Sequence, residues 1–198
     1  RISPHFTFNV LGREINQFNG SEEVKHNLME LVKYLRRSLE LTEKLSVSLQ
    51  DELDFVRTYI ELERGRVGED FVATVTVEDG LDATRIMIPS MIVQIPVENA
   101  IKHGLAGKDG KKELSVYVSR ETNGIRITVT DNGRGYLPQV VSATRGTGTG
   151  LKVLYQTIQL LNTKNKSDKI RFNITNRSDG QTGTEVSVYI PFRFSYDL

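Results

Sequence analysis

The sequence has no cysteine, no long hydrophobic run and almost no net charge. Without cysteine, neither disulfides nor thiolate metal ligands can contribute, which fits a reducing compartment. No apolar run reaches the roughly 18 residues that suggest a membrane span, and no signal peptide is visible. The formal net charge of +1 gives no support to a nucleic-acid footprint or a membrane-surface patch. We therefore expect no nucleic acid among its partners.

The length and composition are those of a globular protein. At 198 residues the chain can form one large domain or two small ones. Its apolar content of 38% and charged content of 26% are typical of such domains. Because the chain begins with Arg1 rather than Met, we expect a fragment, and any membrane anchor would lie upstream of it.

The first third of the chain has helical periodicity. Apolar residues recur at steps of three and four from Ile2 to Gln17 and again from Leu28 to Leu39. Ser21, followed by two glutamates, is typical of a helix start. Ser48, with an aspartate three residues on, is similar to a capping box and predicts a third helix running towards Arg66. These apolar stripes predict mutually packed helices, and part of their surface could equally form a dimer face.

After Gly68 the period of the pattern changes from about 3.6 to 2. Five segments alternate in this way and predict strands at 71–77, 114–118, 125–130, 170–175 and 186–190. Half-buried strands need a layer of helices on their apolar face. The candidates for that layer are Pro89–Leu105 and Leu151–Leu161, and Ser119–Gly124 predicts a hairpin turn.

The predicted fold class is therefore α+β. A helical segment, residues 1–66, precedes a two-layer α/β sandwich with a five-stranded mixed sheet, residues 67–198.

One predicted helix combines burial with polar side chains. The apolar run Ile86–Ile101 predicts a buried helix, yet it contains Glu98 and Asn99 and is followed by Lys102 and His103. On a helix, Asn99 and His103 are four residues apart and share a face. Polar groups that lose water need another partner. A cation with phosphates would be such a partner.

Two glycine motifs lie near the ends of predicted elements. Asp131–Gly135 (Asp-Asn-Gly-Arg-Gly) follows a strand, where an aspartate can accept a hydrogen bond from an exocyclic amine and glycines permit close approach. Gly146–Gly150 (Gly-Thr-Gly-Thr-Gly) directly precedes the helix from Leu151, where free amides and the helix dipole favour phosphate. Taken alone, the first is a common turn and the second a common flexible loop. Neither is a P-loop or a Rossmann fingerprint.

The order of these motifs resembles a known ATP-binding domain. A helix with Glu-Asn, a strand ending in Asp-x-Gly-x-Gly, and Gly-x-Gly-x-Gly before a helix are similar to the Bergerat-type domain shared by histidine kinases, gyrase, Hsp90 and MutL. The LytS-type sensor histidine kinases resemble the chain most. Tyr59–Arg64, Pro89–Gly104 and Gly183–Val186 also look like that family, so the resemblance covers nearly the whole chain.

The resemblance implies ATP and Mg2+ as cofactors. Asn99 would hold Mg2+ against the phosphates. Asp131 would bind the adenine amine beside Thr184, and Gly133 and Gly135 would allow the close approach. The further candidates for cofactor binding are Lys102, His103, Leu151 and the three glycines that would border the ATP lid, Gly146, Gly148 and Gly150.

The resemblance also implies a function for the N-terminal residues. Ser3–Asn9 is similar to the phosphoacceptor box Pro-His-Phe-x-Phe-Asn, so His5 would be phosphorylated on a ring nitrogen. Imidazole is largely neutral and nucleophilic near pH 7. Asn9, four residues on, shares its helix face and could orient the ring or a water. No carboxylate directly follows His5, and Glu98 is the candidate catalytic acid that could replace it. Outside this motif, His5 would be an ordinary terminal residue.

We thus expect the kinase portion of a two-component sensor. ATP would phosphorylate His5, and the phosphoryl group would pass to an aspartate of a response regulator receiver domain. We expect a homodimer, a cytoplasmic fragment of an inner-membrane sensor protein, and membrane contact only through upstream segments.

Two alternatives stay open. In a clamp-type ATPase of the same superfamily, Glu98 would be the general base for water, but such an enzyme needs no His5 box. A catalytically silent dimerisation module would have lost turnover, yet every expected nucleotide ligand is present.

Overall fold

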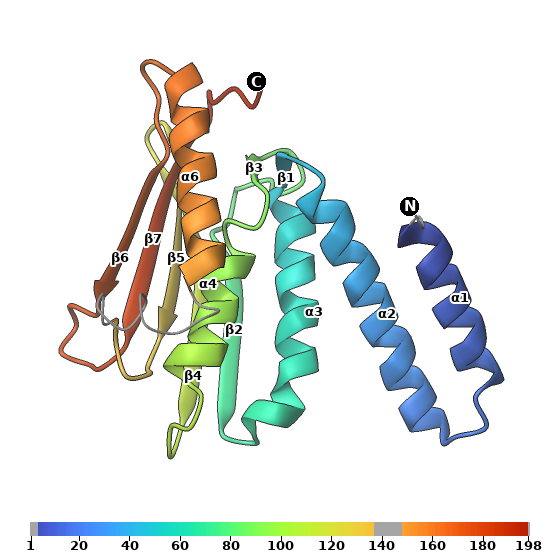
Figure 1. The fold of residues 1–198 in the computed structure, drawn as a ribbon. Helices are drawn as coiled ribbons and strands as arrows, with labels where there is room; N and C mark the ends of the chain where they lie inside the picture. Colours follow the sequence, from blue (N-terminus) through green and yellow to red (C-terminus); the bar gives the residue numbers. More distant parts are fainter. Residues whose placement is uncertain (1–3, 137–147, 198) are drawn as a thin grey trace. The chain divides into compact units, whose positions relative to one another are not determined.

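The computed structural model forms two compact units, Arg1–Lys44 and Leu45–Leu198. It describes residues 4–136 and 148–197 (Figure 1). Compact units in space need not coincide with functional domains, and the division at residue 66 stays a prediction. Within the described ranges, no helix has the length and apolarity that crossing a membrane requires.

The first unit is a pair of helices, α1 (Pro4–Gln17) and α2 (Glu22–Thr42). The predicted start of α2 is confirmed, because the Ser21 hydroxyl accepts a hydrogen bond from the Val24 amide at 3.2 Å. The two helices pack through one small apolar cluster, formed by Phe8, Ile15, Val32, Leu28 and Met29.

The second unit opens with a short ribbon that periodicity did not predict. Strand β1 (Ser46–Ser48) pairs antiparallel with β3 (Met87–Pro89). Helix α3 (Leu49–Val67) follows β1 directly, and its predicted cap is confirmed by the 3.1 Å hydrogen bond from the Asp51 amide to the Ser48 hydroxyl.

A five-stranded mixed sheet forms the body of this unit, as predicted. Its strands are β2 (Phe71–Val77), β4 (Lys112–Glu121), β5 (Gly124–Asp131), β6 (Arg171–Asn176) and β7 (Thr184–Pro191). Their order is β2-β4-β5-β7-β6, with β2 and β4 parallel and every other pair antiparallel. The predicted hairpin is the turn between β4 and β5, where Glu121 pairs with Gly124.

Helices cover one face of this sheet, which makes the predicted two-layer sandwich (Figure 1). They are α3, α4 (Gln94–Asn99) with its continuation η1 (Ala100–Gly104), and α6 (Gly148–Lys164). Side chains from alternate positions of β5 and from one face of α6 are buried in the core: Ile125, Ile127, Val129, Leu154, Ile158 and Leu161.

The prediction of one helix over 89–105 was wrong at its start and incomplete at its end. Residues 87–89 are a strand, and Met91 then adopts a positive φ of 69°, which no helix tolerates. Helix α4 begins only at Gln94. From Ala100 the helix widens to π geometry, with the Leu105 amide donating to the Ala100 carbonyl at 2.8 Å.

We expect the β5 side chains to dominate stability. Replacing Ile127, which is fully buried, by alanine removes apolar contacts and leaves a cavity. Ile127→Ala should lower the free energy of unfolding by about 2–5 kcal/mol in urea titrations. The control is Leu160→Ala on α6, whose side chain is 51% exposed and whose loss should change stability by less than about 0.5 kcal/mol. Equal effects of the two variants would contradict this assignment of the core.

Candidate functional site

Asp131 lies at the end of β5 in a site with little room. It is 4% exposed, and its Oδ1 accepts hydrogen bonds from the Gly133 amide at 2.8 Å and the Thr184 amide at 3.4 Å. Gly104, the last residue of η1, approaches so closely that a Cβ there would stand 3.0 Å from the Asp131 carboxyl carbon. The structure therefore brings three predicted residues, Asp131, Gly133 and Thr184, to one point.

Glycine is required at two positions around this aspartate. A Cβ on Gly133 would stand 2.1 Å from the Gly104 carbonyl oxygen. A Cβ on Gly183 would stand 1.9 Å from the Asp131 carbonyl oxygen, at a positive φ of 147°. The backbone segments could not approach each other as they do with any larger residue.

The surroundings of Asp131 leave it a buried acceptor. Burial raises the pKa of its carboxyl above the ordinary value, while the Gly133 and Thr184 amides and the nearby Arg177 charge act in the opposite direction. Arg177 also donates to the Asp131 carbonyl oxygen at 3.4 Å and is itself paired with Asp179. A ligand N–H group would give the carboxylate a further partner inside the protein.

The loop after Asp131 is held by β6. Gly135 has a positive φ of 88°, and a Cβ there would lie 2.7 Å from Oδ1 of Asn176. That oxygen accepts a hydrogen bond from the Tyr136 amide at 2.7 Å. Sequence reasoning missed Asn176 and Arg177, because nothing in their spacing shows which distant backbone groups they meet.

Asn99 ends α4 with an unsatisfied side chain. It is partly buried, and its Nδ2 is fully enclosed without a hydrogen-bond partner among the described residues. An enclosed polar group of this kind destabilises a protein by about 1–3 kcal/mol unless a ligand or water satisfies it. The expectation that this helix carries a polar group in want of a partner is thus met at Asn99.

Of the neighbouring candidates, Glu98 is partly buried like Asn99, and Lys102 is exposed. Glu98 accepts a hydrogen bond from the Gln94 side chain at 3.1 Å and pairs with Lys102 at 3.8 Å. His103 is exposed in the π segment. Partial burial, followed by the positive charges of Lys102 and Arg134, lowers the pKa of its imidazole, so the neutral form prevails at pH 7.

The start of α6 corrects the predicted boundary at Leu151. The helix begins at Gly148, so Gly148 and Gly150 belong to its first turn, and Leu151 follows them. Gly146 lies outside the described residues. A Cβ on Gly150 would be 3.6 Å from the Ile95 side chain, which places the start of α6 against α4.

Three predicted motifs therefore meet beyond the end of β5, the central strand of the sheet. Helix α4 touches the start of α6 near its own beginning, and its continuation η1 ends against Asp131. The segment that carries Asn99 thus joins the other two motifs.

The predicted phosphoacceptor residues belong to the first unit. His5 lies in the first turn of α1, and Asn9 lies one turn further on. Oδ1 of Asn9 accepts a hydrogen bond from Arg36 on α2 at 3.3 Å. The sequence gives no sign of this contact between the two helices.

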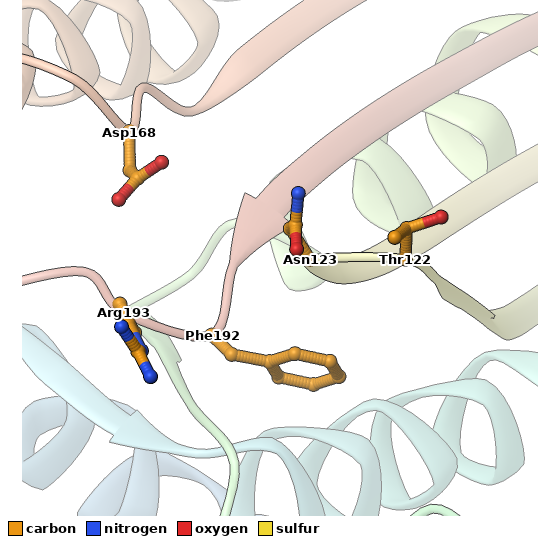
Figure 2. Close-up of a pocket in the computed structure, with 5 residues that line it drawn as sticks. All are labelled: Thr122, Asn123, Asp168, Phe192 and Arg193. Atoms are coloured by element: carbon orange, nitrogen blue, oxygen red, sulfur yellow. The ribbon is translucent and has the colours of Figure 1, made fainter.

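A pocket lies at the opposite end of β5 from Asp131. It has a volume of about 490 Å³, and Figure 2 shows the side chains that line it, from the β4–β5 turn and the stretches before β6 and after β7. Its lining residues are Thr122, Asn123, Asp168, Phe192 and Arg193. Because β5 runs from this turn to Asp131, the pocket is separate from the site described above.

Solved structures with a similar fold are histidine kinases. The histidine kinase domain of the Erythrobacter litoralis EL346 blue-light activated kinase superposes with a TM-score of 0.55 at 19% identity, covering 94% of this chain and 82% of that one. Full-length ShkA in complex with AMPPNP gives 0.52 at 18% identity, covering 95% of this chain and 43% of that one. These likenesses establish the fold class.

Family comparisons then identify the chain. A model described as "Histidine kinase-, DNA gyrase B-, and HSP90-like ATPase" matches residues 84–193, and a "Histidine kinase" model matches residues 1–71. The chain belongs to this histidine kinase, gyrase B and HSP90-like ATPase family.

Curated relatives agree with the family match. The sensor histidine kinase/phosphatase LytS of Staphylococcus aureus is 32% identical, over 92% of this chain and 32% of its own length. The sensor histidine kinase YpdA of Escherichia coli is 28% identical, over 96% of this chain and 33% of its own length. The chain thus spans about a third of these relatives. The predicted resemblance to LytS-type kinases is confirmed.

The close packing at Gly133 is testable. Gly133→Ala forces a methyl group against the Gly104 carbonyl, and such overpacking should lower the free energy of unfolding by about 1–3 kcal/mol. The control is Gly65→Ala on α3, where a Cβ meets nothing within 4 Å and alanine favours the helix by up to about 1 kcal/mol. Chemical denaturation measures both. A Gly133→Ala protein as stable as the parent would show that the two segments do not meet as described.

Proposed function

We propose that the chain is the kinase portion of a two-component sensor histidine kinase. ATP bound beyond the end of β5, beside Asp131, phosphorylates His5. The phosphoryl group then passes to an aspartate of a response regulator receiver domain. The observation that carries the proposal is that α4–η1 contacts both Asp131, at the end of β5, and the start of α6. The same chain also has the His5 box.

The adenine end of the nucleotide would lie at Asp131. Its carboxylate can accept a hydrogen bond from the exocyclic amine of adenine, beside Thr184. Gly133 and Gly135 let the backbone beside Asp131 pack as closely as it does, which no larger residue would permit. The buried position of Asp131 excludes water that would compete for this bond.

The phosphates would lie towards the start of α6. The first-turn amides of a 17-residue helix have no intrahelical acceptors and carry the positive end of its dipole. Gly148 and Gly150 keep these amides accessible. Leu151 follows them, and Lys102 and His103 stand on the neighbouring segment η1.

Asn99 fits a role in holding Mg2+. Its Oδ1 is the atom that could coordinate Mg2+, and its enclosed Nδ2, which has no hydrogen-bond partner among the described residues, could donate to a phosphate oxygen. The described residues contain no group of three or more histidine or acidic side chains able to bind a metal. Asn99 would therefore share Mg2+ with phosphate oxygens and water, as is usual for this ion. Bound there, Mg2+ would neutralise charge on the phosphates.

The transfer itself needs a nucleophile and a proton acceptor. A ring nitrogen of His5 forms a bond to the γ-phosphorus while the bond to the bridging oxygen breaks, and ADP leaves with that electron pair. The proton displaced from the imidazole passes to a base, for which Glu98 is the candidate. Asn9, steadied by Arg36, would orient the ring.

His5 can be tested against a matched histidine. His5→Gln should abolish phosphoprotein formation from γ-labelled ATP, because the nucleophile is missing, while Mg·ATP binding in calorimetry stays unchanged. The control is His26→Gln, an exposed histidine on α2, which should be labelled like the parent. Label that persists after His5→Gln would refute the proposal. ATP turnover without phosphoprotein would favour the clamp-type ATPase.

We further propose that the first unit forms a homodimer. A stripe on α2 is exposed although it is apolar, with Leu31, Leu35 and Leu39 each about two-fifths exposed, and Leu11 on α1 is similar. Their spacing of four places the α2 residues on one side of the helix. A second copy of the same helix pair would cover this surface and form a four-helix bundle.

The dimer proposal predicts a change of mass. The double variant Leu31→Glu/Leu35→Glu places two charges in the apolar stripe and should convert the dimer to a monomer in analytical ultracentrifugation. The control is Val153→Glu, at an exposed apolar residue of α6, which should leave the dimer intact. A parent chain that is monomeric at high micromolar concentration would contradict the proposal.

A further inference from the structure

Glu52 on α3 is a carboxyl group buried away from the nucleotide site. It is 0% exposed. Its two oxygens accept hydrogen bonds from backbone amides of another segment: Oε1 from Met91 and Oε2 from Val93, the latter at 2.7 Å. These bonds tie α3 to the connection between β3 and α4. Burying a carboxyl group is unfavourable, so its presence at this connection calls for a physical reason.

The connection that Glu52 holds has an unusual backbone. Met91 adopts a positive φ of 69°, a conformation that is unfavourable for a residue with a side chain. Ile92 and Val93, which follow this bend and lead into α4, are fully buried. The two bonds to one carboxyl group fix both amides around this bend, and so offset its strain.

Helix α4 cannot fix its own start. It has six residues, and its N-cap position, Val93, provides no side-chain cap. The Glu52 carboxyl instead holds, from α3, the amide of the N-cap residue Val93 and that of Met91 just before it. Fewer than two helical turns then lead from Val93 to Asn99, and the Gln94 side chain donates a hydrogen bond to Glu98 along the way.

The charge state of Glu52 reflects two opposing effects. Burial raises the pKa of its carboxyl to about 8, while the backbone amides of Val93, Met91 and Gln94 lower it. Tyr196 of the C-terminal tail donates to the Met87 carbonyl at 3.0 Å, just before the bend. Burial, and then the Glu52 charge, raise the pKa of the Tyr196 hydroxyl.

We propose that Glu52 is a positioning residue for the kinase reaction: by holding the Met91 and Val93 amides, it sets where α4 presents Asn99 and Glu98 to the metal and phosphates. This inference rests on the proposed function. The adenine end has other supports, because the amides that donate to the Asp131 carboxyl come from Gly133 and Thr184. The two halves of the site should therefore respond differently to a change at Glu52.

Glu52→Gln is the direct test, because the amide keeps the shape but turns an N–H2 group towards one of the two backbone N–H donors. We expect the dissociation constant of Mg·AMPPNP, measured by calorimetry, to rise about tenfold, as one lost hydrogen bond implies. Binding of metal-free ADP in EDTA should weaken less than about twofold. The matched control is Glu61→Gln on the same helix, whose exposed carboxylate pairs with Arg64 at 3.0 Å, and it should bind both ligands like the parent.

Other results of these binding measurements would overturn either the positioning role of Glu52 or the proposed function. Equal binding of Mg·AMPPNP by Glu52→Gln and the parent overturns the positioning role, and so does an equal loss for both ligands, which indicates general damage to the fold. A parent chain that binds no nucleotide refutes the proposed function instead. Should Glu52→Gln fail to fold, hydrogen exchange of the parent decides: Mg·AMPPNP should slow exchange of the Met91 and Val93 amides, and unchanged rates overturn the proposal.

Discussion

The contact between the Gly104 carbonyl and the backbone at Gly133 is the constraint on which the site depends. At this point the helical layer and the sheet approach more closely than any side chain would allow. The approach sets the end of η1 against Asp131, and η1 continues α4, which carries Asn99. Because α4 also touches the start of α6 at Gly150, one segment fixes the spacing of all three parts. A single methyl group added at Gly133 would therefore disturb all three parts of the site.

Long, regular patterns were predictable, and short or irregular ones were not. The five strands and the caps at Ser21 and Ser48 follow from alternation and local hydrogen bonding, which a sequence displays directly. A three-residue strand such as β3 has too few positions to show a period. The positive φ at Met91 and the π turn at Ala100–Gly104 have no compositional sign, since both are imposed by tertiary contacts. The helix there was therefore predicted too long.

In the candidate site, likewise, some residues could be predicted from the sequence and others could not. Asp131 and its glycines could be predicted because they occur together in a motif, and the structure brings them together as expected. Their roles in binding and catalysis stay predictions. The supporting residues could not be found: Glu52 acts on amides 39 and 41 positions away, and Arg177 reaches back 46 positions to Asp131. A sequence shows which residues can donate or accept, but the partners of these residues are settled only by the fold.

The ribbon of β1 and β3 has a mechanical consequence. It joins the first residues of the second unit to the stretch just before α4 through three residue pairs, and the Ser90 amide adds a bond to the Leu45 carbonyl at 3.1 Å. A force that displaces Leu45 must therefore either break these hydrogen bonds or displace Ser90 as well. Ser90 immediately precedes the bend at Met91. Through these bonds, a displacement of Leu45 would be transmitted to Met91 and so to the start of α4, the helix that carries Asn99.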